Sequence, residues 1–438
     1  MFEIGILLLG VFGTLVVAKD WIDKRDLFYP TIYIVPMCLF FYVVFPIVGV
    51  SADEEQFFSF GGGEDALGVY QCVALLVIVS LVAGIQVGSR GRRTMPGRKL
   101  GSASIYTLAT VIGIAGFSAW LYTIEDVGGF ESAYGRAYGG GWAESGYMRE
   151  AMFAGVLSAP MIILARRSRG MRVIDWVLVL LVIAPVLIQG IFGARRGPTF
   201  LALVSVIGAY ILVFRVRVGF LPALTGSVAI GLLLLLLITN RDAIYLGAEL
   251  SEVQEAWTYL RTYHSNEYLY GSALHRYVEA TGDDFNGLRI VAHLIGKIVP
   301  AGIWPTIYED LDAVFQLETD LTLNAGVPVQ KVASVVGWQA AVGAAPGLVG
   351  DIWLEFGWSS PIFAFAVGCI YGLAWRVSAM RPSMQFLSLI LAALSIYLVS
   401  QSIEAWLYRL FLLGLPGYVV LRLFEGGAQV SRSRALRA

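Results

Sequence analysis

Two adjacent arginines, Arg195 and Arg196, stand between two long apolar runs in the stretch GIFGARRGPTF. An arginine placed in hydrocarbon costs about 2.5–3.5 kcal/mol on insertion scales, so such residues are retained near clefts or ionic partners. The planar guanidinium group matches two oxygens of a phosphate with parallel hydrogen bonds. The pair therefore predicts a diphosphate-binding site. The alternative is that the side chain of one arginine extends to the membrane–water interface and the other arginine forms an ion pair with an acid of a loop.

A second basic group lies in the stretch GLRIVAHLIGKIVP. Arg289, His293 and Lys297 recur every four residues, so on a helix they share one face. Pro300 is expected to end that helix. A basic stripe on an apolar helix suits an anionic lipid head group such as a diphosphate. The alternative is an interfacial helix whose long side chains reach water from an apolar base.

Groups that can accept or donate a proton gather late in the chain. Asp351 and Glu355 are four residues apart in GDIWLEFG, and a carboxylate there can take the proton of a hydroxyl nucleophile. They can equally be acids at a helix start, which interact favourably with the helix dipole. The histidines His264, His275 and His293 titrate near neutral pH and are further candidates, although a single histidine is more often structural. No such residues have metal-ligand spacing, so we expect no metal and no other cofactor.

Aromatic side chains accompany these groups. Tyr263, Tyr268 and Tyr270 are predicted to offer flat faces to sugar rings, the alternative being an aromatic belt at the membrane interface. Glu404 and Arg409 flank the late turn QSIEAWLYR, where we expect them to pair with each other.

The composition places these groups in a membrane protein. Of the 438 residues 57% are hydrophobic and only 14% charged, and the mean hydropathy is +0.72, whereas a soluble protein carries about 25% charged residues. The apolar runs are long enough to cross about 30 Å of hydrocarbon as helices. We predict an all-α polytopic membrane protein with eleven transmembrane helices, near 2–18, 31–50, 67–88, 105–124, 150–165, 174–192, 198–214, 219–239, 358–375, 384–402 and 406–423.

The loop charges predict the orientation. Lys and Arg concentrate in every second short loop. Loops with an excess of Lys and Arg face the cytoplasm. We therefore expect the N-terminus outside and the C-terminus inside. Arg195 and Arg196 then face the external side, against this bias, so insertion does not explain them. The net charge of −1 argues against a nucleic-acid partner.

Three regions follow from this topology. Residues 1–239 carry the first eight membrane helices with short external loops. Residues 240–357 form an external region that is too long for a simple connector. Residues 358–438 carry the last three membrane helices and a cytoplasmic tail.

These motifs resemble those of the Wzy-type O-antigen and oligosaccharide repeat-unit polymerases. GARRGPTF is similar to that family's G-x-R-G-P-like turn between two membrane helices, and GDIWLEFGWSSPIFAF to its G-E-x-Y-x-N-F-G-x-x-G-like segment. Asp351 and Trp353 replace the glutamate and tyrosine that are common there. An arginine-x10-glycine pattern of some members fits Arg276 and Gly287, which adds Arg276 to the diphosphate-binding set. The overall pattern covers about residues 30 to 425.

The resemblance implies a glycosyltransferase of the bacterial inner membrane with a GT-C-like helical fold, whose external region 240–357 would be periplasmic. It would polymerise undecaprenyl-diphosphate-linked oligosaccharide repeat units into O-antigen, capsule or exopolysaccharide, without a cofactor. Membrane lipid, a chain-length regulator and a flippase are the implied partners. Two other functions stay open. One is an O-antigen ligase, which transfers the lipid-linked glycan to lipid A core. The other is a transporter, which usually carries ionisable groups near the bilayer midplane.

Overall fold

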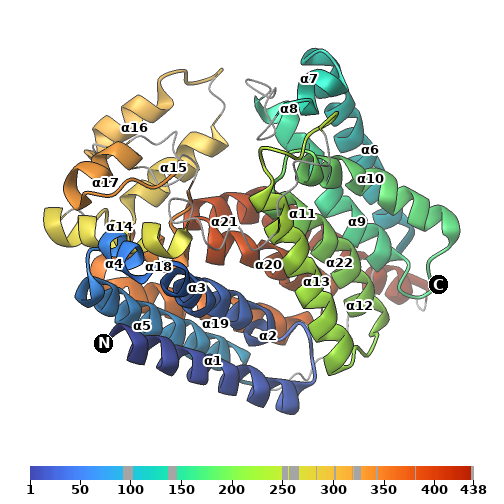
Figure 1. Cartoon of the computed structure of the whole chain (residues 1–438). Helices are drawn as coiled ribbons and strands as arrows, with labels where there is room; N and C mark the ends of the chain where they lie inside the picture. The colour runs from blue at the N-terminus through green and yellow to red at the C-terminus, as the bar shows by residue number, and fades with distance from the viewer. Residues whose placement is uncertain are drawn as a thin grey trace. The chain divides into compact units, whose positions relative to one another are not determined.

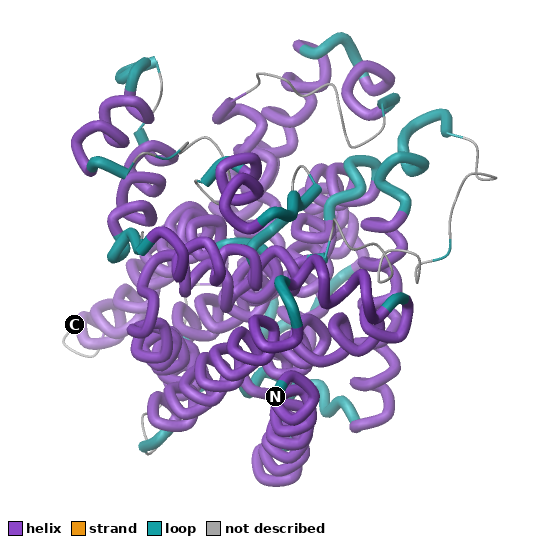
Figure 2. Tube along the Cα trace, turned by 60° about the vertical axis from the view of Figure 1, so that its left-hand side comes forward, coloured by secondary structure: helices purple, strands orange, loops and turns teal. Residues whose placement is uncertain are grey.

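The computed structural model describes residues 1–91, 102–136, 146–248, 255, 266–282, 284–299, 302–317, 319, 327–341, 344–379 and 381–435. Within these ranges every regular element is a helix and no strand occurs (Figure 2). Eleven helical stretches are long and apolar enough to cross a membrane, which confirms the predicted all-α membrane protein. They are Phe2–Lys24, Pro30–Ala52, Glu64–Ser89, Ser102–Asp126, Met148–Ala165, Val173–Ile191, Arg196–Phe214, Phe220–Thr239, Gly347–Ser378, Pro382–Ser400 and Ile403–Glu425.

The chain divides into two compact units, each made of separate chain segments. Unit 1 comprises 1–91, 260–376 and 394–410, and unit 2 comprises 92–259, 377–393 and 411–438. These units cut across the three regions expected from chain order, because helices from both ends of the chain pack together. The long helix α20 (Pro382–Ser400) contributes to both units.

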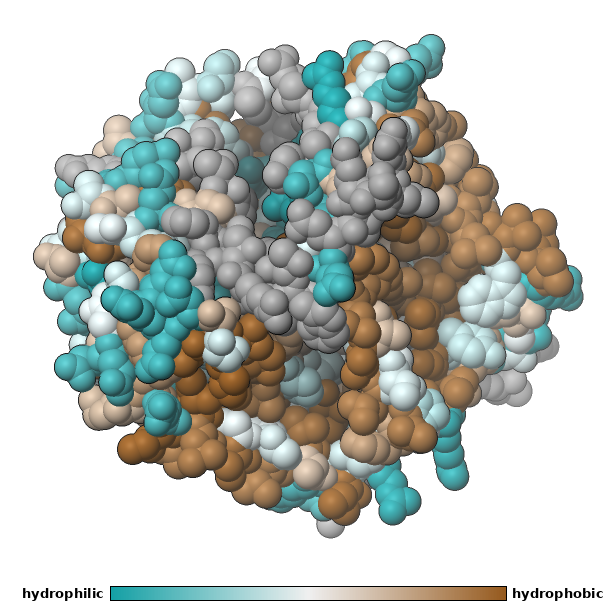
Figure 3. Space-filling model, in the orientation of Figure 1, coloured by the Kyte–Doolittle hydropathy of each residue, from teal (hydrophilic) through white to brown (hydrophobic). Residues whose placement is uncertain are grey.

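Unit 1 contains most of the predicted external region (Figure 1). Its helices are α1 (Phe2–Lys24), α2 (Pro30–Leu39), α3 (Phe45–Ala52), α4 (Glu54–Gly61), α5 (Glu64–Ser89), α14 (Glu267–Thr281), α15 (Leu288–Ile298), α16 (Ile307–Phe315), α17 (Val329–Val336), α18 (Gly347–Phe356), α19 (Ser360–Ser378) and α21 (Ile403–Arg409). In Figure 3, hydrophilic residues gather on the left over α4 and α14, while hydrophobic residues cover the membrane helices.

Glycines let α5 and α19 of unit 1 touch backbone to backbone. A Cβ atom at Gly84 would collide with the carbonyl oxygen of Phe365, and one at Gly88 with that of Cys369. On the other helix, Gly368 and Gly372 are equally close to the backbone of α5. Small residues four apart on both helices give this close crossing in membrane proteins, where van der Waals contact replaces the hydrophobic effect between helices.

Unit 2 is a bundle that carries the arginine pair. Its helices are α6 (Ser102–Asp126), α7 (Phe130–Tyr134), α8 (Gly146–Glu150), α9 (Ala154–Ala165), α10 (Val173–Ile191), α11 (Arg196–Leu203), α12 (Ala209–Phe214), α13 (Phe220–Thr239) and α22 (Leu415–Ala435). Gly155 lets α9 approach the backbone of α10, and the Ser158 hydroxyl donates to the Ala109 carbonyl of α6 at 2.7 Å. α9 is therefore closely packed against both α10 and α6.

Labelling from outside is expected to reach position 309, in α16. Glu309 is exposed in the predicted external region, and the exposed Cys72 would first be replaced by serine to remove a competing thiol. A Glu309→Cys variant should react with a membrane-impermeant maleimide in intact spheroplasts, whereas Arg217→Cys, in a predicted cytoplasmic loop, should react only after permeabilisation. The opposite pattern would reverse the predicted orientation.

Candidate functional site

The basic stripe lies on a helix, as predicted, but its face points inward. α15 begins after Gly287, whose φ of 83° is the left-handed conformation that glycine adopts without strain. Arg289 is fully buried, His293 is nearly so and Lys297 is half-buried. The stripe therefore packs against the protein, with its first residue deepest.

Three carboxylates surround the guanidinium group of Arg289. Its Nη2 atom lies 2.8 Å from an Asp351 oxygen, and it also forms ion pairs with Glu355 through Nε and Glu404 through Nη1. All four side chains have 0% of their surface exposed. We call these four residues the Arg289 cluster.

Three helices of unit 1 build the cluster. α15 supplies the arginine, α18 supplies Asp351 and Glu355 from successive turns of one face, and α21 supplies Glu404. The second oxygen of Asp351 accepts the backbone N–H of Ile403 at 2.6 Å, where α21 begins. Asp351 therefore uses both oxygens to join α15 and α21.

The cluster holds three acidic side chains and one basic side chain. Burial alone lowers the pKa of Arg289, but the nearby carboxylates of Glu355, Glu404 and Asp351 raise it above its ordinary value. The guanidinium group therefore stays charged, and it neutralises only one of three acids. Excess buried charge is costly unless a proton or another cation compensates it.

Glu404 is the site residue that sequence reasoning missed. It forms an ion pair with Arg289, and the guanidinium carbon of Arg409 lies 4.3 Å from the centre of the Tyr397 ring. The structure therefore gives Glu404 a partner, Arg289, that the sequence did not indicate. The local sequence gives no signal for this role beyond the acid itself, because its partner lies far away in the chain.

The predicted glycan-binding tyrosines of α14 belong to the core. Tyr268 and Tyr270 are buried, and the Tyr268 ring stacks on Phe57 with centroids 6.3 Å apart. Neither ring has an exposed face for a sugar, which argues against the predicted contact. Tyr263 and His264 lie outside the described residues.

His275 is packed among aromatic rings. It lies 4.6 Å from the Trp353 ring centroid and 5.9 Å from that of Tyr70, and burial lowers its pKa to about 4. It is therefore neutral near pH 7 and only a weak base. This environment favours a packing role for His275 over the predicted catalytic one.

The burial of His275 predicts acid sensitivity. Its folded pKa of about 4 lies below the ordinary value of 6.5, so the unfolded chain binds more protons between these values. Stability should be complete above pH 6.5 and fall by about 3 kcal/mol towards pH 4. In thermal unfolding in detergent, His275→Gln should lose less stability over this range than the parent. Equal losses would show that His275 is not the titrating group.

The arginine pair begins helix α11 in unit 2. Ala194 has a φ of 46°, Arg195 is the residue before the helix and Arg196 is its first residue. Arg195 is exposed and Arg196 half-buried. Arg195 is also close enough to the buried Tyr134 to lower its pKa, although burial raises that pKa to about 12 overall. A helix N-terminus with guanidinium groups suits an anion.

The remaining basic candidate, Arg276, binds within the protein. Its Nη2 donates to the carbonyl of Val336 at 2.8 Å, which ties α14 to the end of α17, and its guanidinium group lies beside Gly62. This role argues against a diphosphate contact. The arginine pair and the Arg289 cluster belong to different units, so their action on one diphosphate stays a prediction.

Across the ranges that the structure describes, no group of three or more His, Cys, Asp or Glu side chains is placed to hold a metal ion. The position at the centre of the three carboxylates is taken by the Arg289 guanidinium group. Metal-independent chemistry stays a prediction.

Compared with models of protein families, with curated proteins and with solved structures, the chain matches none. The resemblance to repeat-unit polymerases therefore rests on its two motifs. One motif forms the start of α11, and the other contributes two acids to the Arg289 cluster.

Proposed function

We propose that the chain is a membrane glycosyltransferase that polymerises undecaprenyl-diphosphate-linked oligosaccharide repeat units on the external face of a bacterial inner membrane. The observation that carries this proposal is the Arg289 cluster, with three buried carboxylates around one guanidinium group. Two of these acids belong to the polymerase-like motif.

The cluster supplies the proton acceptor in this proposal. The acceptor sugar hydroxyl attacks the anomeric carbon of the donor glycan, the bond from that carbon to the diphosphate oxygen breaks, and the hydroxyl proton passes to a carboxylate. Asp351 uses both of its oxygens in structural contacts, so we assign this role to Glu355 or Glu404. Both are buried, and the proposal therefore requires that acceptor binding opens a path to them.

The arginine pair holds the leaving diphosphate in this proposal. Guanidinium groups at a helix N-terminus stabilise the charge that develops on the diphosphate as its bond breaks. Catalysis then needs no nucleotide-sugar site, because the donor is already activated on its lipid.

An Arg196→Lys variant is expected to impair turnover although it keeps the charge. Lysine lacks the fork that binds two phosphate oxygens at once, and loss of a donor aimed at developing charge typically lowers rates by about 10²–10³. Arg196→Ala should reach that range and Arg196→Lys should lie below the parent, with Arg217→Lys unchanged as the exposed control. Normal polymer lengths from well-expressed Arg196→Ala would remove Arg196 from the site.

The direct test uses the purified chain in nanodiscs with lipid-linked repeat units, with the products resolved on a gel. A ladder of lengths, retained in EDTA, supports the proposed polymerase without a metal. Transfer of one glycan to a lipid A core acceptor would instead identify a ligase. Loss of all activity in EDTA, restored by Mg²⁺, would overturn the metal-independent mechanism.

A proton-coupled carrier is the second candidate. The carboxylates of the Arg289 cluster lie within candidate membrane spans, Gly347–Ser378 and Ile403–Glu425, and buried acids in excess of their partners are typical of proton pathways. Uptake of lipid-linked glycan into proteoliposomes, dependent on a pH gradient and without a change in glycan length, would favour the carrier.

A further inference from the structure

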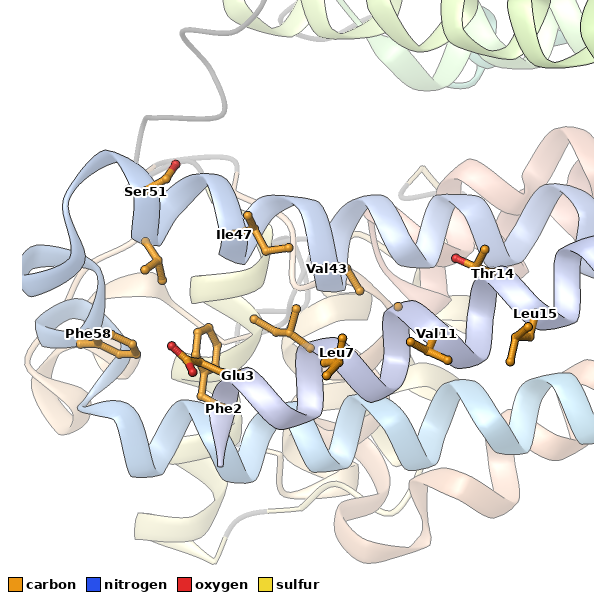
Figure 4. A pocket seen from close by; sticks show the side chains of 13 residues that line it. Phe2, Glu3, Leu7, Val11, Thr14, Leu15, Val43, Ile47, Ser51 and Phe58 are labelled. Carbon is orange, nitrogen blue, oxygen red and sulfur yellow. The ribbon is translucent and has the colours of Figure 1, made fainter.

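An apolar groove runs along α1 where this helix faces the turn Phe40–Val44 and α3 in unit 1 (Figure 4). Its volume is about 620 Å³, and its walls include Phe2, Ile6, Leu7, Val11, Val43 and Ile47. Leu7 and Val11 are more than half exposed on α1, so the groove opens towards the surface that membrane lipid covers.

The local sequence opens this groove. Gly13 lets α1 approach Leu39 closely, because a Cβ atom at this position would lie only 2.7 Å from the Leu39 side chain. Beyond this contact the second helix passes through the π-helical turn Phe40–Val44. Gly10 has no side chain to fill the space, and a Cβ atom at this position would lie 3.7 Å from the Val43 side chain.

The length of the groove fits one lipid chain. At 1.5 Å per helical residue, the wall from Phe2 to Leu15 is about 20 Å long. One leaflet contributes about 15 Å of the hydrocarbon core. The groove therefore accommodates an acyl chain of the leaflet next to the start of α1, with its head group at the Phe2 end.

That end of the groove is acidic. Glu3 lies on its wall beside Phe2 and Phe58 (Figure 4). Residues 1–18 and 40–70 contain no Lys or Arg, and their other acids are Asp53, Glu54, Glu55, Glu64 and Asp65. Two cations near this end have partners within the protein. The terminal amino group lies 3.7 Å from Glu64, and Arg276 donates to the carbonyl of Val336. The local charge thus favours a head group that carries a cation over a head group whose only charge is a phosphate.

We propose that this groove is a binding site for a glycerophospholipid with a primary ammonium head group, phosphatidylethanolamine. Its acyl chain lies along α1, and its ammonium group meets the carboxylate of Glu3. The acidic rim disfavours an anionic lipid such as phosphatidylglycerol or a polyprenyl diphosphate. This inference does not depend on the proposed glycosyltransferase activity.

The test measures lipid binding to the purified full chain by native mass spectrometry, with phosphatidylethanolamine, phosphatidylcholine and phosphatidylglycerol of identical acyl chains. The parent should prefer phosphatidylethanolamine. Glu3→Gln should reduce that preference by about fivefold, because an exposed ion pair changes an equilibrium constant by little more than this factor. Gly10→Phe should fill the groove and reduce binding of all three lipids.

The control is Glu131→Gln, which removes an exposed carboxylate from unit 2 and should leave the preference unchanged. Equal or tighter binding of phosphatidylglycerol, competition by a polyprenyl diphosphate, or a preference that Glu3→Gln leaves intact would each overturn the proposal. None of these outcomes depends on whether polymer is formed.

Discussion

Arg289→Met is expected to abolish the accumulation of folded protein. The substitution leaves Asp351, Glu355 and Glu404 buried around a site without its cation. Breaking one buried ion pair costs about 3–5 kcal/mol, which is a large part of the 5–15 kcal/mol that stabilises a typical domain. The measurement is the yield of monodisperse protein and its thermal unfolding in detergent.

A charge-matched variant separates electrostatics from packing. Arg289→Met combined with Glu355→Gln and Glu404→Gln removes two of the three excess charges, and it should recover much of the lost stability because neutral replacement of a whole buried ionic group is tolerated. If Arg289→Met alone were as stable as the parent and merely inactive, Arg289 would act as a substrate ligand instead.

Glu355→Gln and Glu404→Gln are expected to have unequal effects on turnover. The residue that accepts the hydroxyl proton should lose about 10²–10⁴ in rate when it becomes an amide, while the other should lose far less. Neither change should destabilise the fold, since each removes one of the acids that outnumber the single guanidinium group. The measurement is initial polymerisation rate against thermal stability for each variant.

Asp351→Asn serves as the matched control. Its oxygens hold Arg289 and the start of α21, so this variant should lose stability as well as rate. Full activity in both glutamine variants would exclude the cluster as the proton acceptor and would leave it a purely structural element.

The membrane helices could be predicted from sequence because each is determined by its own length and hydrophobicity. The last span, predicted at 406–423, is observed within Ile403–Glu425. The four-residue spacings likewise placed Asp351 and Glu355 on one face of a helix. Each of these features depends only on neighbouring residues.

The partners of those residues could not be predicted in the same way. A four-residue spacing shows that Arg289, His293 and Lys297 share a face, but not whether that face meets water, lipid or protein. Arg289 meets acids 62 or more positions later in the chain, and such pairing depends on how helices pack. For the same reason, nothing local in the sequence of Tyr268 distinguishes a ring in the core from one in a binding site.

The glycine contact between α5 and α19 has a consequence for biosynthesis. Gly84 and Gly368 lie so far apart that, at usual synthesis rates, roughly 15–60 s separate their emergence from the ribosome. Residues 92–259, which belong to unit 2, enter the membrane during that interval. During this time the small-residue face of α5 is without its final neighbour and contacts lipid or an insertion factor. Unit 1 can complete its packing only after the late helices have been synthesised.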